Sequence, residues 1–524
     1  MKANSTAVVA LLAAGSAGLA LLGSPMLRAA AAEGDLQTGV RSVTSALALI
    51  ERNYAEPVSS EKLMYQGAIP GMLHTLDPHS SFLDPTEWRE MQSRQSAQYF
   101  GVGMEINMDG AMVIVAQPMP ASPALAAGLR RGDVIMAIDG RDARSLDSAA
   151  VRDLLRGPRG TPVTITVRRE GVSEPLSMTV VRAAIQTSNV DAFWLRRGIA
   201  YLGISTFEAQ NVAADVEAAL VKLGEPTITG LVLDLRSNPG GLVTEAVAVA
   251  GRYLRSGQTV VSDHGRAQAE QVFRAKAQPN GQKYPMVVLV DRHSASAAEI
   301  VAGALQDHDR AWLIGENTFG KGLVQGQYPL SEDAALLLTI AHYYTPSGRL
   351  IQRDYQHRSF FDYYYAGRND TPDLSDVKET DSGRKVYGGG GITPDEKYSP
   401  PRATPLEHRL AVSGAFFHFG GQYFSGHTPE LPEGWAPDDM VLGSFRGYLS
   451  GQQFPVTDSE FAADREWIGN QLRLELYSRA FGKQGANQAA LQTDPEVIHA
   501  IDSLPKAQAL FEQAQHVLVR RAQR

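Results

Sequence analysis

Two continuous apolar runs in the middle of the chain constrain its fold more than any other feature. Leu231–Leu235 and Met286–Val290 have the length and composition of strands that are buried on both faces. Helical periodicity surrounds them, at residues 213–223, 244–254 and 297–305. Helices that alternate with buried strands pack on both faces of a sheet. The pattern therefore predicts an α/β core with a mixed sheet, which we assign to residues 184–400.

Two further regions precede this core. Residues 33–96 carry apolar residues at helical spacing and are expected to be mainly helical, with a turn at Asp77–Ser81. Residues 97–183 alternate short apolar runs with turn residues, which is typical of a small β-rich module. In this module we expect Phe100–Ile106 to be a loop that leads into a strand.

Beyond the core, residues 401–524 return to a helical pattern, which is strongest at 461–481 and 495–517. Tyr387–Gly391 and Ser399–Pro401 are expected to be loop and linker, because glycine and proline interrupt regular structure. Together the regions describe a multidomain protein that combines α/β and α+β parts.

The N-terminus has the pattern of a secretory signal. Lys2 precedes an apolar stretch at Ala7–Gly23, and small residues follow at Ala29–Ala32. We expect residues 1–32 to be removed and the mature protein to act outside the cytoplasm, in the periplasm. An uncleaved membrane anchor is the alternative, although the stretch is short for a membrane span.

Composition excludes several kinds of function. The 524 residues carry a formal net charge of −8 and include no cysteine. An acidic chain without a basic stripe cannot replace the counterions of a nucleic acid, so nucleic acid is not an expected partner. The missing cysteines exclude disulfides, thiolate metal sites and a cysteine nucleophile.

Ser296 lies where the second apolar run gives way to a helix. Backbone N–H groups at a helix N-terminus have no intrahelical partner and can hold an oxyanion. A serine there is also a common helix cap, and Ser294 is the natural candidate for that role. Gly240 and Gly241 follow the first apolar run, where glycines let the main chain approach a substrate, although an ordinary turn has the same composition. With Ala297, these residues form a candidate nucleophile and oxyanion site.

Lys321 is the candidate base. A serine attacks an acyl carbon only if another group removes its proton, and a neutral lysine amine can do so. The ordinary pKa of lysine is about 10.4, so a neutral amine at pH 7 costs roughly 4–5 kcal/mol, which only desolvation can supply. Gln325 can hold the amine without adding charge, whereas a carboxylate would favour the ammonium form, so we interpret Asp307 as structural with at most an indirect role. A surface lysine in a loop is the alternative.

Nucleotide binding and a histidine base are two other chemistries that parts of this region resemble. Gly315–Lys321 matches most of a phosphate-binding P-loop, but Gly322 replaces the Ser or Thr that would hold Mg²⁺, so a nucleotide is not expected. Histidine is the usual base for serine, and the three histidines near the site in sequence are His293, His308 and His342. Their spacing resembles no metal site.

Taken in order, these residues resemble the C-terminal processing proteases, or tail-specific proteases, a serine–lysine peptidase family. The resemblance runs from Val43 to Asp395 and rests on six segments: Ser294–Glu299, Phe319–Gly322 with Gln325, Asp234–Gly241, Thr345–Gly348, Gly391–Asp395 and Leu76–Ser80. Ala298 stands where the family often has Ser, and Ser237 where it often has Asn. Neither departure removes a reactive group.

The resemblance implies a PDZ domain at residues 97–183 and a serine protease core at 184–400. The PDZ loop Phe100, Gly101, Val102 and Gly103 would bind a free C-terminal carboxylate, with Val151 and Leu155 lining the side-chain groove.

The implied activity is endopeptidase cleavage near the apolar C-terminal tails of extracytoplasmic proteins. Ser296 is then the nucleophile, Lys321 the base and Gln325 its support, and no metal, nucleotide or other cofactor is required.

Two alternative functions stay open at this point. One is a PDZ-containing extracytoplasmic scaffold or chaperone without proteolytic activity. The other is a Ser–His hydrolase that uses His308 or His342. The sequence also leaves open a homodimer or larger oligomer, an adaptor protein, and the role of residues 404–524.

Overall fold

The structure is a computed structural model that describes residues 37–96, 98–267, 269–276, 282–355, 363, 373–399, 401–425, 427, 429–432 and 434–522. The predicted signal segment at residues 1–32 lies outside these residues. The chain divides into two compact units. The first contains the chain up to Pro85 together with Gln327–Leu338, and the second contains Thr86–Gly326 and Thr339–Arg524.

The first unit is mainly helical, as expected. Residues 37–53 form a helix, and three short helical elements follow: α2 Ser60–Leu63, η1 Met64–Ala68 and α3 Ile69–His74. The predicted turn forms because Asp77 Oδ1 accepts hydrogen bonds from the N–H groups of His79 and Ser80, both at 2.7 Å. A short strand that was not predicted, β1 (Ser81–Leu83), pairs with residues 335–337 of β18 (Ala335–Tyr344).

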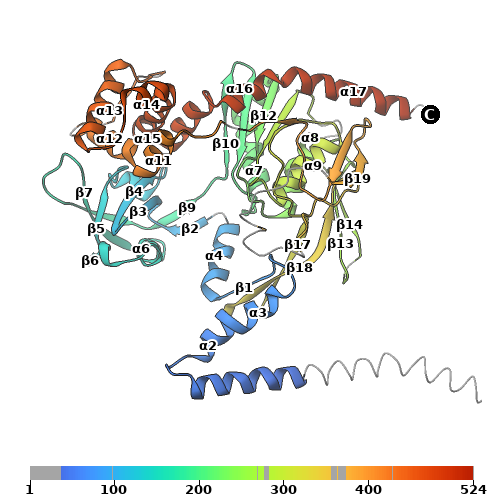
Figure 1. Ribbon diagram of the computed structural model, residues 1–524, viewed down its shortest axis with the longest axis horizontal. Helices are drawn as coiled ribbons and strands as arrows, with labels where there is room; N and C mark the ends of the chain where they lie inside the picture. The colour runs from blue at the N-terminus through green and yellow to red at the C-terminus, as the bar shows by residue number, and fades with distance from the viewer. Residues whose placement is uncertain are drawn as a thin grey trace, which may run out of the picture. The chain divides into compact units, whose positions relative to one another are not determined.

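The β-rich module of the second unit is an open antiparallel sheet with two helices packed on it (Figure 1). Its strands run in the order β3 (Met104–Asp109), β4 (Met112–Pro118), β5 (Val134–Ile138), β7 (Pro162–Arg168) and β8 (Leu176–Val181), and β6 (Arg141–Asp142) pairs with β5. The helices are α5 (Pro123–Ala126) and α6 (Ser148–Leu155). Strand β3 ends the order, so one of its edges has no neighbouring strand within this sheet.

Two sequence predictions for this module are wrong. Phe100 and Gly101 lie in strand β2 (Gln98–Gly101), which pairs with β9 (Ala183–Gln186), rather than in a loop. A local window cannot reveal a partner strand that is so distant along the chain. Val151 and Leu155 are 0% and 6% exposed and belong to the module's apolar core, so they do not line an open groove.

The core sheet is mixed, as predicted. Strands β11 (Ile199–Ile204), β12 (Gly230–Asp234), β15 (Met286–Val290), β16 (Trp312–Gly315) and β21 (Glu396–Lys397) are parallel neighbours in that order. Strand β10 (Val190–Arg196) adds an antiparallel edge beside β11. The predicted helices are present as α7 (Val212–Leu223), α8 (Val243–Tyr253) and α9 (Ala297–Asp307).

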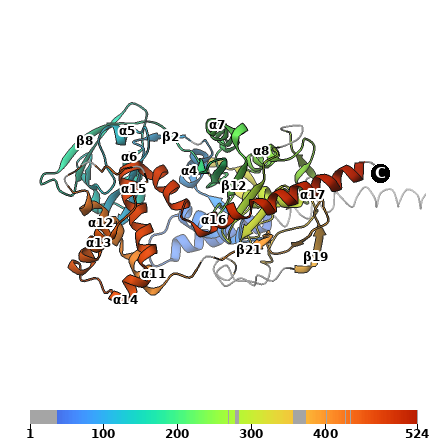
Figure 2. The same ribbon diagram turned by 90° about the horizontal axis from the view of Figure 1, so that it is seen from above.

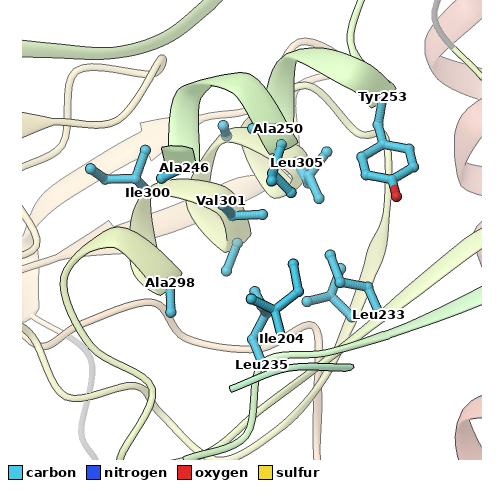
Figure 3. Close-up of a cluster of buried hydrophobic side chains, with 14 of the residues drawn as sticks. Ile204, Leu233, Leu235, Ala246, Ala250, Tyr253, Ala298, Ile300, Val301 and Leu305 are labelled. Atoms are coloured by element: carbon cyan, nitrogen blue, oxygen red, sulfur yellow. The ribbon is translucent and has the colours of Figure 1, made fainter. Parts of the chain in front are cut away.

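Different helices cover the two faces of this sheet. On one face α7, α8 and α9 pack on alternate strand residues such as Leu233, and Figure 3 shows the side chains of α8 and α9 meeting those of the strands. On the other face the C-terminal helices α16 (Pro495–Asp502) and α17 (Leu504–Ala522) pack on the intervening residues, such as Val232 and Val287 (Figure 2). The last two helices of the chain therefore complete the apolar core around the mixed sheet.

The remaining C-terminal helices have an apolar core of their own. They are α11 (Pro405–Ser413), α12 (Ala415–Tyr423), α13 (Asp439–Gly451), α14 (Asp458–Ala463) and α15 (Arg465–Leu491). Helix α15 contacts the β-rich module, because Arg131 forms an ion pair of 2.6 Å with Glu475. None of the helices in the described ranges combines the length and apolar character needed to cross a membrane.

Several further strands belong to sheets other than the core sheet. They are β13 (Thr259–His264), β14 (Gln271–Arg274), β17 (Leu323–Pro329), β19 (Asp373–Glu379) and β20 (Lys385–Gly388). Strand β20 corrects the expectation of a loop over Tyr387–Gly391, since Tyr387 pairs with Val377 of β19. Residue 400 of the predicted linker lies outside the described residues.

Candidate active site

Ser296 occupies a strained position at the start of α9. Its backbone φ is 54° and its ψ is −114°, a conformation that a residue with a side chain rarely adopts. Ser296 is itself the N-cap residue of the helix. Ser294, the expected cap, instead donates its hydroxyl to the carbonyl of Leu235 at 2.7 Å. Ser294 thus anchors the turn to Leu235, the residue that directly follows β12.

Asp291, which the sequence analysis missed, connects the two loops that follow β12 and β15. Its Oδ1 accepts from the N–H groups of Ser237, His293 and Ser294, each at 2.9 Å. Its Oδ2 accepts from the hydroxyl of Ser237 at 3.0 Å. An aspartate directly after a buried strand was the only available signal, since Ser237 is far from it in sequence.

The glycine loop at Gly240 and Gly241 lies directly against the segment that contains Ser296. A Cβ atom added to Gly240 would lie 2.7 Å from Ser296 Cβ and 2.8 Å from Ala297 N, so only glycine fits there. The N–H of Gly240 donates to Asn238 Oδ1 at 2.8 Å. Ala297 is the first residue of α9, where the N–H has no intrahelical acceptor. Gly240, Gly241 and Ala297 are therefore brought together, as the oxyanion prediction requires.

Lys321 follows Gly320, whose φ of 84° places the chain in the left-handed region. The side chain of Lys321 is half-buried, and its Nζ donates to Gln325 Oε1 at 2.9 Å. Gln325 lies on β17, four residues further along. Gln325 is therefore placed to hold the lysine amine, as the sequence analysis expected.

Glu299 joins the serine and lysine segments. Its Oε2 accepts from the N–H of Ser296 at 2.8 Å and from the N–H of Lys321 at 2.9 Å. Its Oε1 accepts from the N–H of Gly320 at 2.7 Å and from Thr318 Oγ1 at 2.5 Å. Burial raises the pKa of this fully buried carboxyl, and the four hydrogen bonds oppose that rise. The capping-box spacing of Ser296 and Glu299 was the signal that could have identified it.

The segments near the end of the core hold the lysine loop in place. Thr318 N donates to Ile392 O at 3.1 Å, and Ile392 N donates to Thr318 Oγ1 at 2.6 Å. Gln352 Oε1 accepts from Gly322 N at 2.8 Å. These contacts give a physical reason for the sequence matches at Gly391–Asp395 and near Thr345–Gly348.

Asp307 lies at the opposite end of α9 from Ser296. It pairs with the fully buried Arg349 at 2.7 Å and accepts from the N–H of Ser347 at 3.0 Å. Those partners belong to the segment that follows β18, so Asp307 fixes this segment to the helix.

The three histidines have other surroundings. His308 follows Asp307 at the far end of α9, where its Nδ1 lies 2.8 Å from Asp381 Oδ2. Burial lowers the pKa of His308, but the hydrogen bond and charge of Asp381 outweigh it, so the net pKa is raised. Burial lowers the pKa of His342. His293 is exposed in the turn before Ser294.

Family comparisons match three parts of the chain. Residues 198–356 match the model of peptidase family S41, residues 114–169 match a PDZ domain, and residues 24–86 match the N-terminal domain of the activating protease CtpB. These matches end before the C-terminal helices, which begin at α11.

Three curated relatives have similar sequences. The carboxy-terminal-processing protease of Bartonella bacilliformis is 40% identical over 300 residues, which is 56% of this chain and 68% of that protein. The carboxyl-terminal-processing protease of Synechocystis sp. is 38% identical over 57% of this chain and 70% of its own length. The carboxy-terminal processing protease CtpB of Bacillus subtilis is 32% identical over 62% of this chain and 68% of its own length.

Proposed function

The chain belongs to the carboxy-terminal processing proteases of peptidase family S41, and on this premise we propose that Ser296 is its nucleophile and Lys321 its general base. The protein is a serine-type peptidase with a PDZ domain, and it binds peptide or protein substrates. The residue assignment has one principal support. A single carboxylate oxygen of Glu299 binds the main-chain N–H groups of both residues, which keeps their segments adjacent.

In the proposed reaction, Lys321 Nζ takes the proton of Ser296 Oγ as that oxygen attacks the peptide carbonyl carbon. The resulting ammonium returns the proton to the leaving amine, and the C–N bond breaks to give an acyl-enzyme. Water then attacks the ester, with Lys321 again as base, and releases the new C-terminus. The neutral amide of Gln325 supports this role, because it positions the amine without the charge that would favour the ammonium form.

The oxyanion of the tetrahedral intermediate would be held by two N–H groups. Ala297 supplies the first, at the N-terminus of α9. The second comes from the glycine loop, where Gly240 N–H is already bonded to Asn238. Gly241 is the better donor, because its bridge to Phe207 uses the carbonyl of Gly240 and the N–H of Leu242, so its own N–H points away from Phe207.

The PDZ domain is proposed to capture the free apolar C-terminus of a substrate. The open edge of β3 supports this role, since an extended peptide can add a strand there. Phe100, Gly101, Val102 and Gly103 lie directly before β3 and remain the proposed carboxylate-binding segment. Val151 and Leu155 of helix α6 are buried, so they cannot form the helical wall of the proposed peptide-binding groove.

Export and self-association complete the proposal. The signal-like pattern of residues 1–32 supports action on extracytoplasmic proteins. In the first unit, the helix at residues 37–53 exposes large apolar side chains, including Val40 at 56% and Leu49 at 62%. Such an exposed face supports association into a homodimer or larger oligomer.

The experiment is cleavage of a protein that carries an apolar C-terminal tail. Ser296→Ala and Lys321→Ala should each fold and each lose activity, whereas His308→Ala should retain turnover, because His308 lies at the far end of α9. Cleavage by Lys321→Ala at the wild-type rate would exclude the lysine as base. Loss of turnover only in the histidine variant would favour a Ser–His hydrolase, and an inactive wild-type protein would favour a scaffold.

A further inference from the structure

The side chain of Tyr343, on strand β18, contacts both residues of the proposed catalytic pair, Ser296 and Lys321. It is the penultimate residue of β18 and is 1% exposed. Its hydroxyl lies 3.0 Å from the carbonyl oxygen of Ser296 and 2.5 Å from the carbonyl oxygen of Lys321. One side chain therefore contacts the main-chain carbonyls of both residues.

We propose that Tyr343 is a positioning residue, whose hydroxyl is shared between the Ser296 and Lys321 carbonyls and fixes the nucleophile relative to its base. This inference rests on the proposed function and deepens it. It assigns to Tyr343 a role in the geometry of the reaction, without contact to the substrate.

The strain at Ser296 shows why a second support is needed. A residue with a side chain keeps a positive φ only when its surroundings hold it there. The N–H of Ser296 is held by Glu299, and its carbonyl accepts from Ile300 N at 3.0 Å and from Tyr343. Both polar main-chain atoms of the strained residue are thus fixed, one of them by the tyrosine.

Glu299 and Tyr343 bind different main-chain atoms of the same two residues. Glu299 accepts from the two N–H groups of Ser296 and Lys321, and Tyr343 contacts the two carbonyl oxygens of the same residues. Burial, followed by the charge of Glu299, raises the pKa of Tyr343 well above its ordinary value. The hydroxyl therefore keeps its proton and can act as a donor at neutral pH.

The main chain of Tyr343 is held on both sides. Its own N–H donates to the carbonyl of Gly322 at 3.0 Å, directly beside Lys321. Across the sheet it is paired with Asp263 of β13. A side chain on a paired strand holds its neighbours more accurately than one on a loop.

The test compares two tyrosine-to-phenylalanine variants in the full-length protein. Tyr343→Phe removes the shared hydroxyl and keeps the ring. Tyr253→Phe is the matched control, because Tyr253 is also 1% exposed and, among the described residues, its buried hydroxyl has no hydrogen-bond partner. With a tailed substrate, Tyr343→Phe should lower kcat on the order of 10–100-fold with KM nearly unchanged, since small misplacements of catalytic groups cost about this much. Tyr253→Phe should leave kcat unchanged.

A rescue variant separates positioning from packing. Replacing Tyr343 with 4-aminophenylalanine returns an N–H donor to the same end of the ring and should recover most of kcat. The rate at which a fluorophosphonate labels Ser296, measured per folded molecule, should fall in Tyr343→Phe and recover in the amino variant.

The inference is overturned if Tyr343→Phe keeps the wild-type kcat, or if the amino variant is as slow as a folded Tyr343→Phe. If Tyr343→Phe does not fold, the amino variant decides, and a slow but folded amino variant overturns the inference. Ser296→Ala and Lys321→Ala are measured in parallel. Activity in either one rejects the proposed function itself, whereas two inactive variants beside a fully active Tyr343→Phe reject only the role of Tyr343.

Discussion

The two helical layers of the core differ in how they relate to the catalytic loops, although both bury a face of the same sheet. The layer of α7, α8 and α9 presents Ser296 at the N-terminus of α9. The layer of α16 and α17 presents Asp494 and Glu496 at the N-terminus of α16. These carboxylates lie 2.9 Å from Nη1 of Arg236, at the start of the glycine loop. The second layer thus reaches the candidate site through a charged contact, whereas the first supplies Ser296, the proposed nucleophile.

This difference shows that a helix remote in sequence can belong to the catalytic core. The family comparisons stop at residue 356, yet α16 fills the sheet face opposite α9. Its apolar residues include Val497 and Ala500, both 0% exposed. Matched substitutions in α9 and α16 test how far the two layers are equivalent.

The largest expected effect is on folding, and it should be equal for the two layers. Val301→Asp in α9 and Val497→Asp in α16 each place a carboxylate at a site that is 0% exposed. Each should destabilise the protein by about 4 kcal/mol or more, because an unpaired charge is buried. Urea unfolding measures this, with Val412→Asp, at a residue 72% exposed, as the control. A loss below about 1 kcal/mol for Val497→Asp would show that the second layer is dispensable.

Glu299→Gln should have the largest effect on turnover within the first layer. The amide offers one acceptor oxygen where the carboxylate offers two, so one set of N–H donors near Ser296 or Lys321 loses its partner. We expect kcat to fall by about 10²-fold, which cleavage of a tailed substrate would measure. Glu475→Gln is the control, since Glu475 is also buried but pairs with Arg131 away from the site. Equal losses of kcat in both variants would contradict a specific role for Glu299.

Arg236→Ala should affect turnover more than Arg252→Ala, although both arginines are ion-paired. Arg236 connects the α16 carboxylates to Asp234 at the end of β12 and precedes the glycine loop, so its loss should lower kcat by roughly tenfold. Arg252 pairs with Glu225 on the first layer, away from the loops, and its loss should lower stability with little change in kcat. Kinetics and unfolding of both variants distinguish the cases. A reversed order of kcat values would contradict the comparison.

The smallest effect concerns pH. Burial raises the pKa of Glu496 to about 7, and Arg236 opposes this rise while facing two further carboxylates, Asp494 and Asp234. The folded protein therefore holds this proton more tightly than the unfolded chain does. The stability contribution is complete below about pH 4.5 and falls by about 1–3 kcal/mol as pH rises to 7.

Glu496→Gln should flatten this decline. The measurement is urea unfolding at pH 5 and pH 8, in which the difference between the two pH values should be smaller for the variant. An identical pH dependence in wild type and variant would exclude Glu496 as the group responsible.

The sequence predicted those parts of the fold and site whose signals are local. Met286–Val290 and the helix after it stand out because a buried strand and its crossover helix each have a continuous apolar pattern. The pairing of Lys321 with Gln325 was also accessible, since the two residues are four positions apart.

The errors arose where a distant partner decides the conformation. Phe100 and Gly101 became a strand because β9 pairs with them. Val151 and Leu155 were expected at a groove, but the same helical spacing also fits the core, and burial selected the core.

The amino-acid sequence alone indicated the alternating strands and helices of the core and the candidate hydroxyl and amine, because apolar periodicity and residue chemistry are local properties of the chain. Only the tertiary structure decided that Glu299 and Tyr343 hold Ser296 and Lys321 by their main-chain atoms, and that α16 covers the far face of the sheet. The two side chains bind backbone groups, which every residue carries, so apart from the capping-box spacing of Ser296 and Glu299 the sequence does not mark these contacts.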